Sequence, residues 1–325
     1  MNYKSFFTLF LSCMLAALPA FSAFADEPVI SYTNGHSVLT SLDVTCAPTD
    51  IVSTPEGTLL VTDDYAKVIW QIRDGICTLY AGSTSTIDPY GEPLGGYNDA
   101  RHDESLFKDP WAISPFLDGW AVSDAENNAV RVLRPDRTET ANASTNEPLK
   151  VGDMGVIFDH PTGLATDDRG YLYVSDTGNN AVRVISPSGN VVSAAKRLNR
   201  PTALAWHDGW LYIAETGANR ILRVKDGQKE YLAGSGENGF ADGPANAAAF
   251  SSPMGIAVGS DGTVYVSDTV NGAVRRIRNG SVDTLLAPDP ADPRTYPVSP
   301  TGLVVSDGVL YVCDAYSRKL FMIPL

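Results

Sequence analysis

The sequence predicts an all-β protein, a six-bladed β-propeller of four-stranded antiparallel blades. One block of sequence occurs six times, and a proline opens each copy. An acidic residue follows each proline by 14 or 15 positions, and an aliphatic residue follows each acid by six. Such repeats cannot bury their apolar faces alone, so they pack on one another. The prolines are Pro48, Pro110, Pro161, Pro201, Pro253 and Pro300.

The third copy, residues 161–184, shows the expected elements most clearly. Residues 163–166 predict a short strand of small and aliphatic side chains. After a turn, residues 171–175 are rich in aromatic and β-branched types, which favour strands. A second turn leads to 181–185, where apolar and polar residues alternate with the period of a strand. Residues 190–194 form a fourth run, so each copy predicts one four-stranded blade of a propeller.

The two ends of the chain are expected to share the sixth blade. An open ring would leave two exposed sheet edges, so a propeller must close. The sixth copy ends after its third strand, and strand-like runs at 29–32 and 37–44 precede the first copy. We therefore expect one N-terminal strand to complete the sixth blade. The alternative is a seven-bladed ring with a degenerate blade after Pro48, although 88–109 carries the Pro and Gly of a loop.

The repeats resemble the NHL repeat. The resemblance rests on a proline and glycine–aliphatic opening, a strand ending in an acid, a Thr-Gly-Asn turn and an Arg-containing strand. It is strongest in LYVSDTGNNAVRV (172–184), LYIAETGANRILRV (211–224) and VYVSDTVNGAVRRI (264–277), and weaker in copies one, two and six. The connection at 233–258 is similar to that of bacterial family members. The resemblance implies a β-propeller of an exported bacterial kind.

The first 25 residues predict a secretory signal peptide, which would leave a mature propeller of residues 26–325. Lys4 gives a positively charged start, an apolar stretch follows, and Ala23 and Ala25 offer small residues at the cleavage site. The alternative is an uncleaved membrane anchor, since the apolar stretch is nearly long enough to span a bilayer. We expect a periplasmic or secreted protein without a membrane span after cleavage.

The charge of the chain limits its partners. The formal net charge is −14. An acidic surface of this size disfavours nucleic acid and anionic membranes. We therefore expect no nucleic-acid partner and a monomeric protein.

Three cysteines follow the predicted cleavage site. A bond between Cys46 and Cys313 would link the two ends of the chain, whereas Cys46 with Cys77 would close a loop around the first copy. Disulfides are typical of oxidising compartments. The choice depends on Cα separations, so both pairings stay open.

The six recurring acids have two interpretations. They could form a crown of carboxylates for a cation, with Asp124, Asp176, Asp268 and Asp314 as the candidate ligands of a hard ion such as Ca²⁺. A structural interpretation is favoured, in which each acid accepts hydrogen bonds from backbone N–H groups of its turn. We expect no cofactor, with Ca²⁺ as the alternative. Arginines recur seven residues after three of the acids, and we expect their stems to cover apolar surface at blade edges.

His102 and His160 are the two histidines considered for catalysis, because both lie in loops on the face of the acids. The resemblance extends to related propellers that act as lyases and place histidines around the central channel. Gluconolactonase-like propellers hold a divalent ion there. With two candidates, a site of three histidines is disfavoured.

The copies also differ in the length of the loops that connect them. The connections at 81–109, 134–160 and 233–252 are expected to share one face, and binding sites on rigid scaffolds are usually made by such loops. Two of the loops carry versions of one motif, and its residues Tyr97, Asp99, Phe240 and Asp242 are the candidate ligand contacts. We therefore predict an exported, non-catalytic propeller that binds a protein, peptide or glycan on these loops. The alternative is a metal-dependent lactonase or lyase at the channel mouth.

Overall fold

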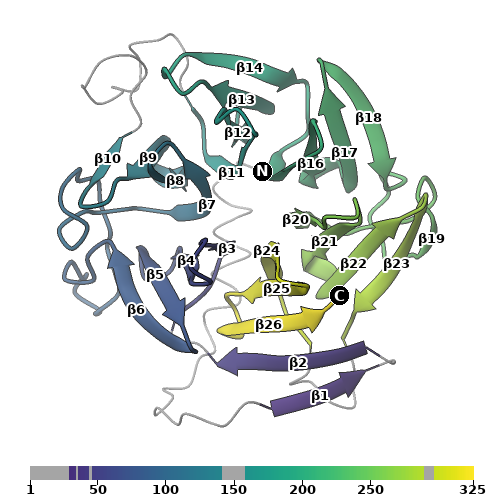
Figure 1. Cartoon of the computed structure of the whole chain (residues 1–325), viewed down its shortest axis with the longest axis horizontal. Coiled ribbons are helices and arrows are strands. Elements are labelled where there is room, and N and C mark those ends of the chain that lie inside the picture. The colour runs from purple at the N-terminus through teal and green to yellow at the C-terminus, as the bar shows by residue number, and fades with distance from the viewer. Residues whose placement is uncertain (1–28, 34–35, 44–45, 141–157, 289–295) are drawn as a thin grey trace.

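The computed structural model describes residues 29–33, 36–43, 46–140, 158–288 and 296–325. They form six antiparallel sheets arranged radially around a central axis (Figure 1). The prediction of a six-bladed all-β propeller is therefore confirmed. The predicted signal peptide, residues 1–25, lies outside the described residues.

Each of the first five blades is built from consecutive strands, and the first strand of each lies nearest the axis (Figure 1). The first blade contains β3 (Asp50–Ser53), β4 (Leu59–Asp63), β5 (Val68–Arg73) and β6 (Ile76–Ala81). The second contains β7 (Pro110–Phe116), β8 (Gly119–Asp124), β9 (Ala129–Leu133) and β10 (Thr138–Thr140). The third contains β11 (Pro161–Thr166), β12 (Leu172–Asp176), β13 (Ala181–Ile185) and β14 (Val191–Lys196).

The next two blades repeat this order. The fourth contains β15 (Pro201–His207), β16 (Trp210–Glu215), β17 (Arg220–Lys225) and β18 (Gln228–Ala233). The fifth contains β20 (Pro253–Val258), β21 (Val264–Asp268), β22 (Ala273–Arg278) and β23 (Ser281–Leu286), with the short β19 (Gly243–Pro244) added at its outer edge. No named strand lies within 82–109, in agreement with the loop predicted there.

The sixth blade joins the two ends of the chain. Its inner strands are β24 (Pro300–Ser306), β25 (Val309–Asp314) and β26 (Lys319–Pro324). The N-terminal β2 (His36–Asp43) pairs antiparallel with β26, with Leu42 opposite Leu320. The predicted closure by an N-terminal strand is confirmed. One more strand, β1 (Val29–Thr33), pairs with β2 as a fifth, which the sequence prediction did not include.

The innermost strands approach so closely that a methyl group does not fit between some of them. A Cβ atom built on Gly255 would lie 1.8 Å from the Thr301 carbonyl oxygen, and one on Gly302 would lie 2.5 Å from the Asp50 Cα. The small residues of the first strand of each copy therefore allow the blades to converge.

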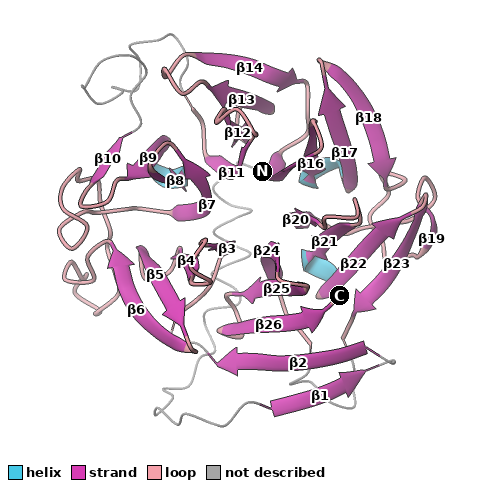
Figure 2. Ribbon diagram, viewed as in Figure 1, coloured by secondary structure: helices cyan, strands magenta, loops and turns pink. Residues whose placement is uncertain are grey.

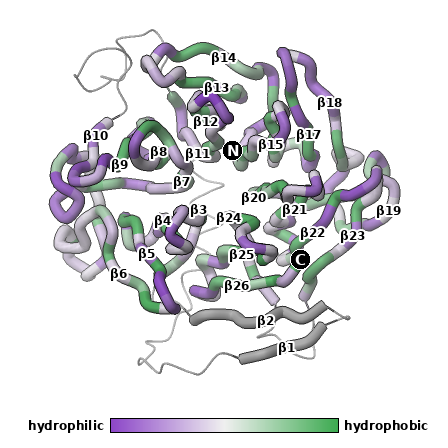
Figure 3. Tube along the Cα trace, in the orientation of Figure 1, coloured by the Kyte–Doolittle hydropathy of each residue, from purple (hydrophilic) through white to green (hydrophobic). Residues whose placement is uncertain are grey.

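The core is divided among the blade junctions. The described residues form six apolar clusters, and each lies between two neighbouring blades. Figure 3 shows that the hydrophobic residues lie along the strands of the blades. At the junction that closes the ring, Cys46 and Ile51 pack with Cys313 and Leu320. Closure therefore joins two buried apolar faces as well as two sheet edges.

The turn between the second and third strands ends in a left-handed residue. Three of these turns are single 3₁₀ turns, η1 (Ala125–Asn127), η2 (Thr216–Ala218) and η3 (Thr269–Asn271), and Figure 2 shows them as short helical segments among strands. The next residue in each is left-handed, with φ between 52° and 61°, and is Asn128, Asn219 or Gly272. Asn and Gly adopt this conformation most readily. No helix in the described ranges is long and apolar enough to cross a membrane.

Candidate functional site

The recurring acids are buried and hold the segment that enters their own blade. Asp176 Oδ1 accepts the Asp159 N–H at 2.8 Å, and Asp268 Oδ1 accepts the Ser251 N–H at 2.7 Å. The Asp314 carboxylate likewise accepts a backbone N–H two residues before its proline. These are the contacts of structural caps, although the donors come mainly from the entering segment and less from the turn. Metal binding by Asp124, Asp176, Asp268 and Asp314, the alternative to this structural role, stays untested.

The recurring arginines do not cover apolar surface at blade edges, and that expectation is wrong. The side chains of Arg131 and Arg275 are fully buried, and Nη1 of each contacts the acid of its own copy, Asp124 at 2.9 Å and Asp268 at 2.6 Å. A buried guanidinium needs a carboxylate partner because its desolvation is costly. In the first blade, Trp70 stands at this position and donates its indole N–H to Asp63 at 2.9 Å.

Two of the arginines lie in duplicated cages, which we call the arginine cages. In the first, Arg131 Nη2 also binds Asp99 at 2.6 Å, and its guanidinium lies 4.7 Å from the Tyr97 ring centroid. In the second, Arg275 makes the same contacts with Asp242, at 2.6 Å, and with the Phe240 ring, at 4.7 Å. Charge pairing and the ring faces both stabilise the buried cation. The two loops are therefore fixed to their blades by the residues of the shared motif.

The contacts within the arginine cages limit which atoms of the candidate contact residues can bind a ligand. The carboxylates of Asp99 and Asp242 also accept the backbone N–H of Thr140 and Thr284, so their oxygens are engaged within the protein. Tyr97 and Phe240 cover the arginines but remain about half exposed. Ligand contact by these four residues stays a prediction, which the exposed rings support better than the carboxylates.

The two candidate histidines lie in different environments. His160 follows Asp159 at the entrance to the third blade, and its Nδ1 lies 2.7 Å from the Asp159 carboxylate. His102 lies in the loop between the first two blades and lines a pocket that does not include His160. Within the part of the chain that the structure describes, no group of three or more His, Cys, Asp or Glu side chains could hold a metal ion. The expectation of no cofactor and its alternative, Ca²⁺, both stay untested.

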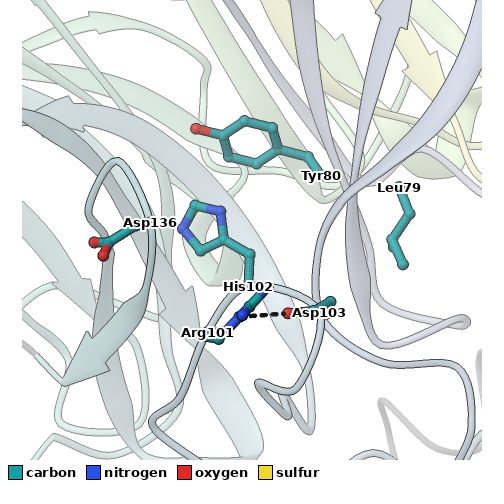
Figure 4. A pocket seen from close by; sticks show the side chains of 6 residues that line it. All are labelled: Leu79, Tyr80, Arg101, His102, Asp103 and Asp136. Atoms are coloured by element: carbon teal, nitrogen blue, oxygen red, sulfur yellow. Dashed lines mark ion pairs between the residues drawn. The ribbon is translucent and has the colours of Figure 1, made fainter.

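The pocket around His102 has a volume of about 490 Å³ and opens between the first two blades (Figure 4). Leu79 and Tyr80 come from β6, and Asp136 comes from the turn before β10. The loop between the blades supplies the rest of the lining. Those residues are Arg101, His102 and Asp103. The volume is in the range of small-molecule sites.

The polar groups of this pocket are only partly satisfied. The His102 Nε2 atom is buried, and it has no hydrogen-bond partner in the described part of the chain. The His102 ring lies 5.3 Å from the Tyr80 ring at an angle of 42° (Figure 4). Burial raises the pKa of the Tyr80 phenol. Arg101 and Asp103 form an exposed ion pair at 3.4 Å, which a ligand could replace at little cost.

Only part of this pocket could be predicted from the sequence. His102 was a candidate catalytic histidine, and 81–109 was predicted to be a long loop. Nothing in the sequence brings the end of β6 and the turn at Asp136 to the same place, because they belong to different blades. The rarity of histidine and the length of the loop were the signals that pointed to this region.

The central channel contains a second feature that the sequence did not reveal. A cavity of about 90 Å³ lies among the innermost strands, and Asp50 is the one charged residue that lines it. The other five copies have Ala or Gly at this position. Burial raises the pKa of Asp50 to about 7, although the Ile113 N–H donates to its Oδ2 at 3.1 Å.

Two further carboxyl groups lie close to residues that line this channel. Asp64 accepts the Thr49 hydroxyl at 2.9 Å, and Thr49 lines the channel cavity. Asp109 precedes Pro110, next to the channel-lining Trp111. Burial raises the pKa of both groups, and the charge of Asp64 adds to the effect on Asp109. The junction of the first two blades therefore carries two carboxyl groups with raised pKa values close to the channel-lining residues Thr49 and Trp111.

Comparisons with known proteins agree with the repeat pattern. The model of the NHL repeat matches residues 158–185 and 250–277. NHL repeat-containing protein 2 of Gallus gallus is 43% identical over 68 residues, which cover 21% of this chain and 9% of that protein. The chain spans between 5% and 17% of the length of the first curated relatives that it matches.

Solved structures show the same fold at low identity. An auxiliary nutrient binding protein from Bacteroides thetaiotaomicron superposes with a TM-score of 0.62 at 14% identity, over 85% of this chain and 68% of that one. Virginiamycin B lyase from Staphylococcus aureus superposes with a TM-score of 0.59 at 16% identity, over 88% and 98%. This chain therefore carries NHL repeats, at residues 158–185 and 250–277, within a six-bladed β-propeller.

Proposed function

We propose that the protein is an exported, non-catalytic binding propeller whose ligand occupies the pocket between the first two blades. The observation that carries the proposal is the buried, unpartnered Nε2 of His102 in a pocket of about 490 Å³. A buried polar atom without a partner is costly, so a ligand that supplies one gains both a hydrogen bond and specificity. The recurring acids and arginines, in contrast, are engaged in holding the ring together.

The chemistry of the pocket favours a glycan. Its lining combines the rings of Tyr80 and His102 with Arg101 and two carboxylates. Aromatic rings pack on the apolar faces of sugars, and charged groups make strong hydrogen bonds to hydroxyls. A solved neighbour is described as an auxiliary nutrient binding protein, which supports a binding role for a ring of this shape. A short peptide is the competing ligand.

A binding screen followed by calorimetry tests the proposal. Arrays of oligosaccharides and short peptides select a ligand, and its affinity is then measured for His102→Ala and Tyr80→Ala. We expect each substitution to weaken binding at least tenfold. Tyr231→Ala is the matched control, because Tyr231 is an exposed aromatic residue on β18, the outer strand of a distant blade. Unchanged affinity in both pocket variants would reject this site, and a peptide hit that depends on them would replace the glycan.

A second function is supported by the carboxyl groups at the channel mouth. A metal-dependent lactonase or lyase would use this end of the ring, where Asp64 and Asp109 have raised pKa values. Virginiamycin B lyase shares the fold. Elemental analysis of the purified protein separates the two proposals. A stoichiometric divalent metal, together with a melting temperature that falls on chelation and recovers on adding the metal back, would favour the enzyme.

A further inference from the structure

The three cysteines of the described chain meet at the junction that closes the ring. Cys46 and Cys313 are buried in the apolar cluster between the sixth and first blades, and Cys77 packs against it from β6. Cys46 comes three residues after β2, the strand that completes the sixth blade. Each cysteine therefore belongs to a different part of the junction, namely the entering segment, the outer strand of the first blade and β25.

The sulfur positions separate the two pairings that the sequence left open. The Sγ atoms of Cys46 and Cys77 lie 3.9 Å apart. A disulfide has an S–S distance of about 2.05 Å, and rotation of two cysteine side chains supplies the remaining approach of about 2 Å. Cys313 packs in the same apolar cluster from β25, and the short sulfur–sulfur distance is the one between Cys46 and Cys77.

We propose that Cys46 and Cys77 form a disulfide across the entrance to the first blade, while Cys313 remains a thiol. The bond would tie the segment that follows β2 to the outer strand of the first blade. The bond would close a loop that contains the first blade, and the pairing of β2 with β26 would remain the link between the two ends of the chain.

The environments of the two thiols indicate the order of the reaction. Cys77 is partly exposed, whereas Cys46 is buried, and the hydrogen bond with Cys77 together with burial raises the pKa of Cys46. The Cys77 thiolate therefore attacks the oxidant, a low-molecular-weight disulfide such as oxidised glutathione, and releases one thiol. The deprotonated Cys46 sulfur then attacks Cys77 Sγ and releases the second. Two thiols lose two protons and two electrons, and the oxidant is reduced to two thiols.

Mass mapping of the whole protein tests the proposal. The folded chain is equilibrated with oxidised glutathione, quenched, alkylated and digested without reduction. We expect a peptide that joins Cys46 to Cys77, with alkylated Cys313. A peptide that joins Cys313 to either partner, or alkylation of all three residues, would overturn the proposal.

Thermal unfolding gives a second measurement. Reduction should lower the melting temperature of the wild-type protein by about 5 °C, because the bond closes a loop of about 30 residues in the unfolded chain. Cys46→Ser and Cys77→Ser should both lose this difference between the oxidised and reduced forms, whereas Cys313→Ser, the matched control, should keep it. A difference that disappears in Cys313→Ser and persists in Cys77→Ser would contradict the assignment.

Discussion

Asp50 in the central channel should make the stability of the protein depend on pH in a specific direction. Its carboxyl group has a pKa of about 7 in the folded ring, against 3.8 for an unperturbed aspartate, because burial disfavours the charged form. Asp50→Asn removes the charge but leaves a side-chain oxygen that can accept the Ile113 N–H. The substitution therefore isolates the cost of ionising this one group.

The magnitude follows from the difference in pKa. One unit corresponds to about 1.4 kcal/mol, so the shift of Asp50 costs the folded state about 4 kcal/mol once the group is ionised in both states. A raised carboxyl pKa gives stability that is fully present below the unfolded pKa and is lost as the pH rises towards the folded pKa. The advantage of Asp50→Asn should therefore grow by about 2.5 kcal/mol between about pH 5 and about pH 8, and then level off.

Urea unfolding of both proteins at a series of pH values measures this difference, because the change in midpoint at constant slope reports the free energy of unfolding. Asp261→Asn is an informative control. Hydrogen bonds from Thr263 lower the pKa of Asp261, so Asp261→Asn should lose stability only as the pH rises through the acidic range below about 5. Its difference from the wild type should stay constant between about pH 5 and about pH 8, where that of Asp50→Asn changes. Parallel curves for the wild type and Asp50→Asn across this range would show that the channel does not desolvate Asp50.

Two further substitutions and one deletion test how the ring is built. Arg275→Ala should lower the free energy of unfolding by about 3–5 kcal/mol, because it leaves Asp268 buried without its cation. Adding Asp268→Asn to the same chain should recover part of this loss, and urea unfolding measures both changes. Gly255→Ala should lower the melting temperature strongly, because the new Cβ would lie 1.8 Å from the Thr301 carbonyl oxygen; a melting temperature equal to that of the wild type would contradict the close approach of the inner strands. Deletion of residues 29–43 should abolish cooperative unfolding seen by circular dichroism, since the sixth blade loses its outer strands, and a sharp transition in the shortened chain would show that closure by β2 is dispensable.

The architecture could be predicted from the sequence because it is repeated. Six copies of one pattern predict the same blade. Where the pattern is weak in one copy, as in the turn that begins at Asp64, the other copies still identify the strands. The closing strand was predictable for a related reason, since a missing fourth strand at one end matched an unassigned run at the other. The fifth strand β1 has no counterpart in the repeat and could not be inferred in this way.

The site could be predicted only in part, because its residues come from features that do not repeat. His102 drew attention as a rare residue, but its neighbours Tyr80 and Asp136 lie in different blades, and only the ring brings them together. The buried arginines show the same limit. Their regular spacing was visible, but the partners Asp99 and Asp242 belong to loops whose path over the blades is set by tertiary contacts.

The most direct test of the proposed binding site is a crystal structure of the protein with the ligand that the arrays select. The predicted result is a ligand between the first two blades that packs on Tyr80 and hydrogen-bonds the Nε2 atom of His102. A ligand bound beside Asp64 and Asp109, with only water in the pocket around His102, would contradict the proposal and favour the enzymatic alternative.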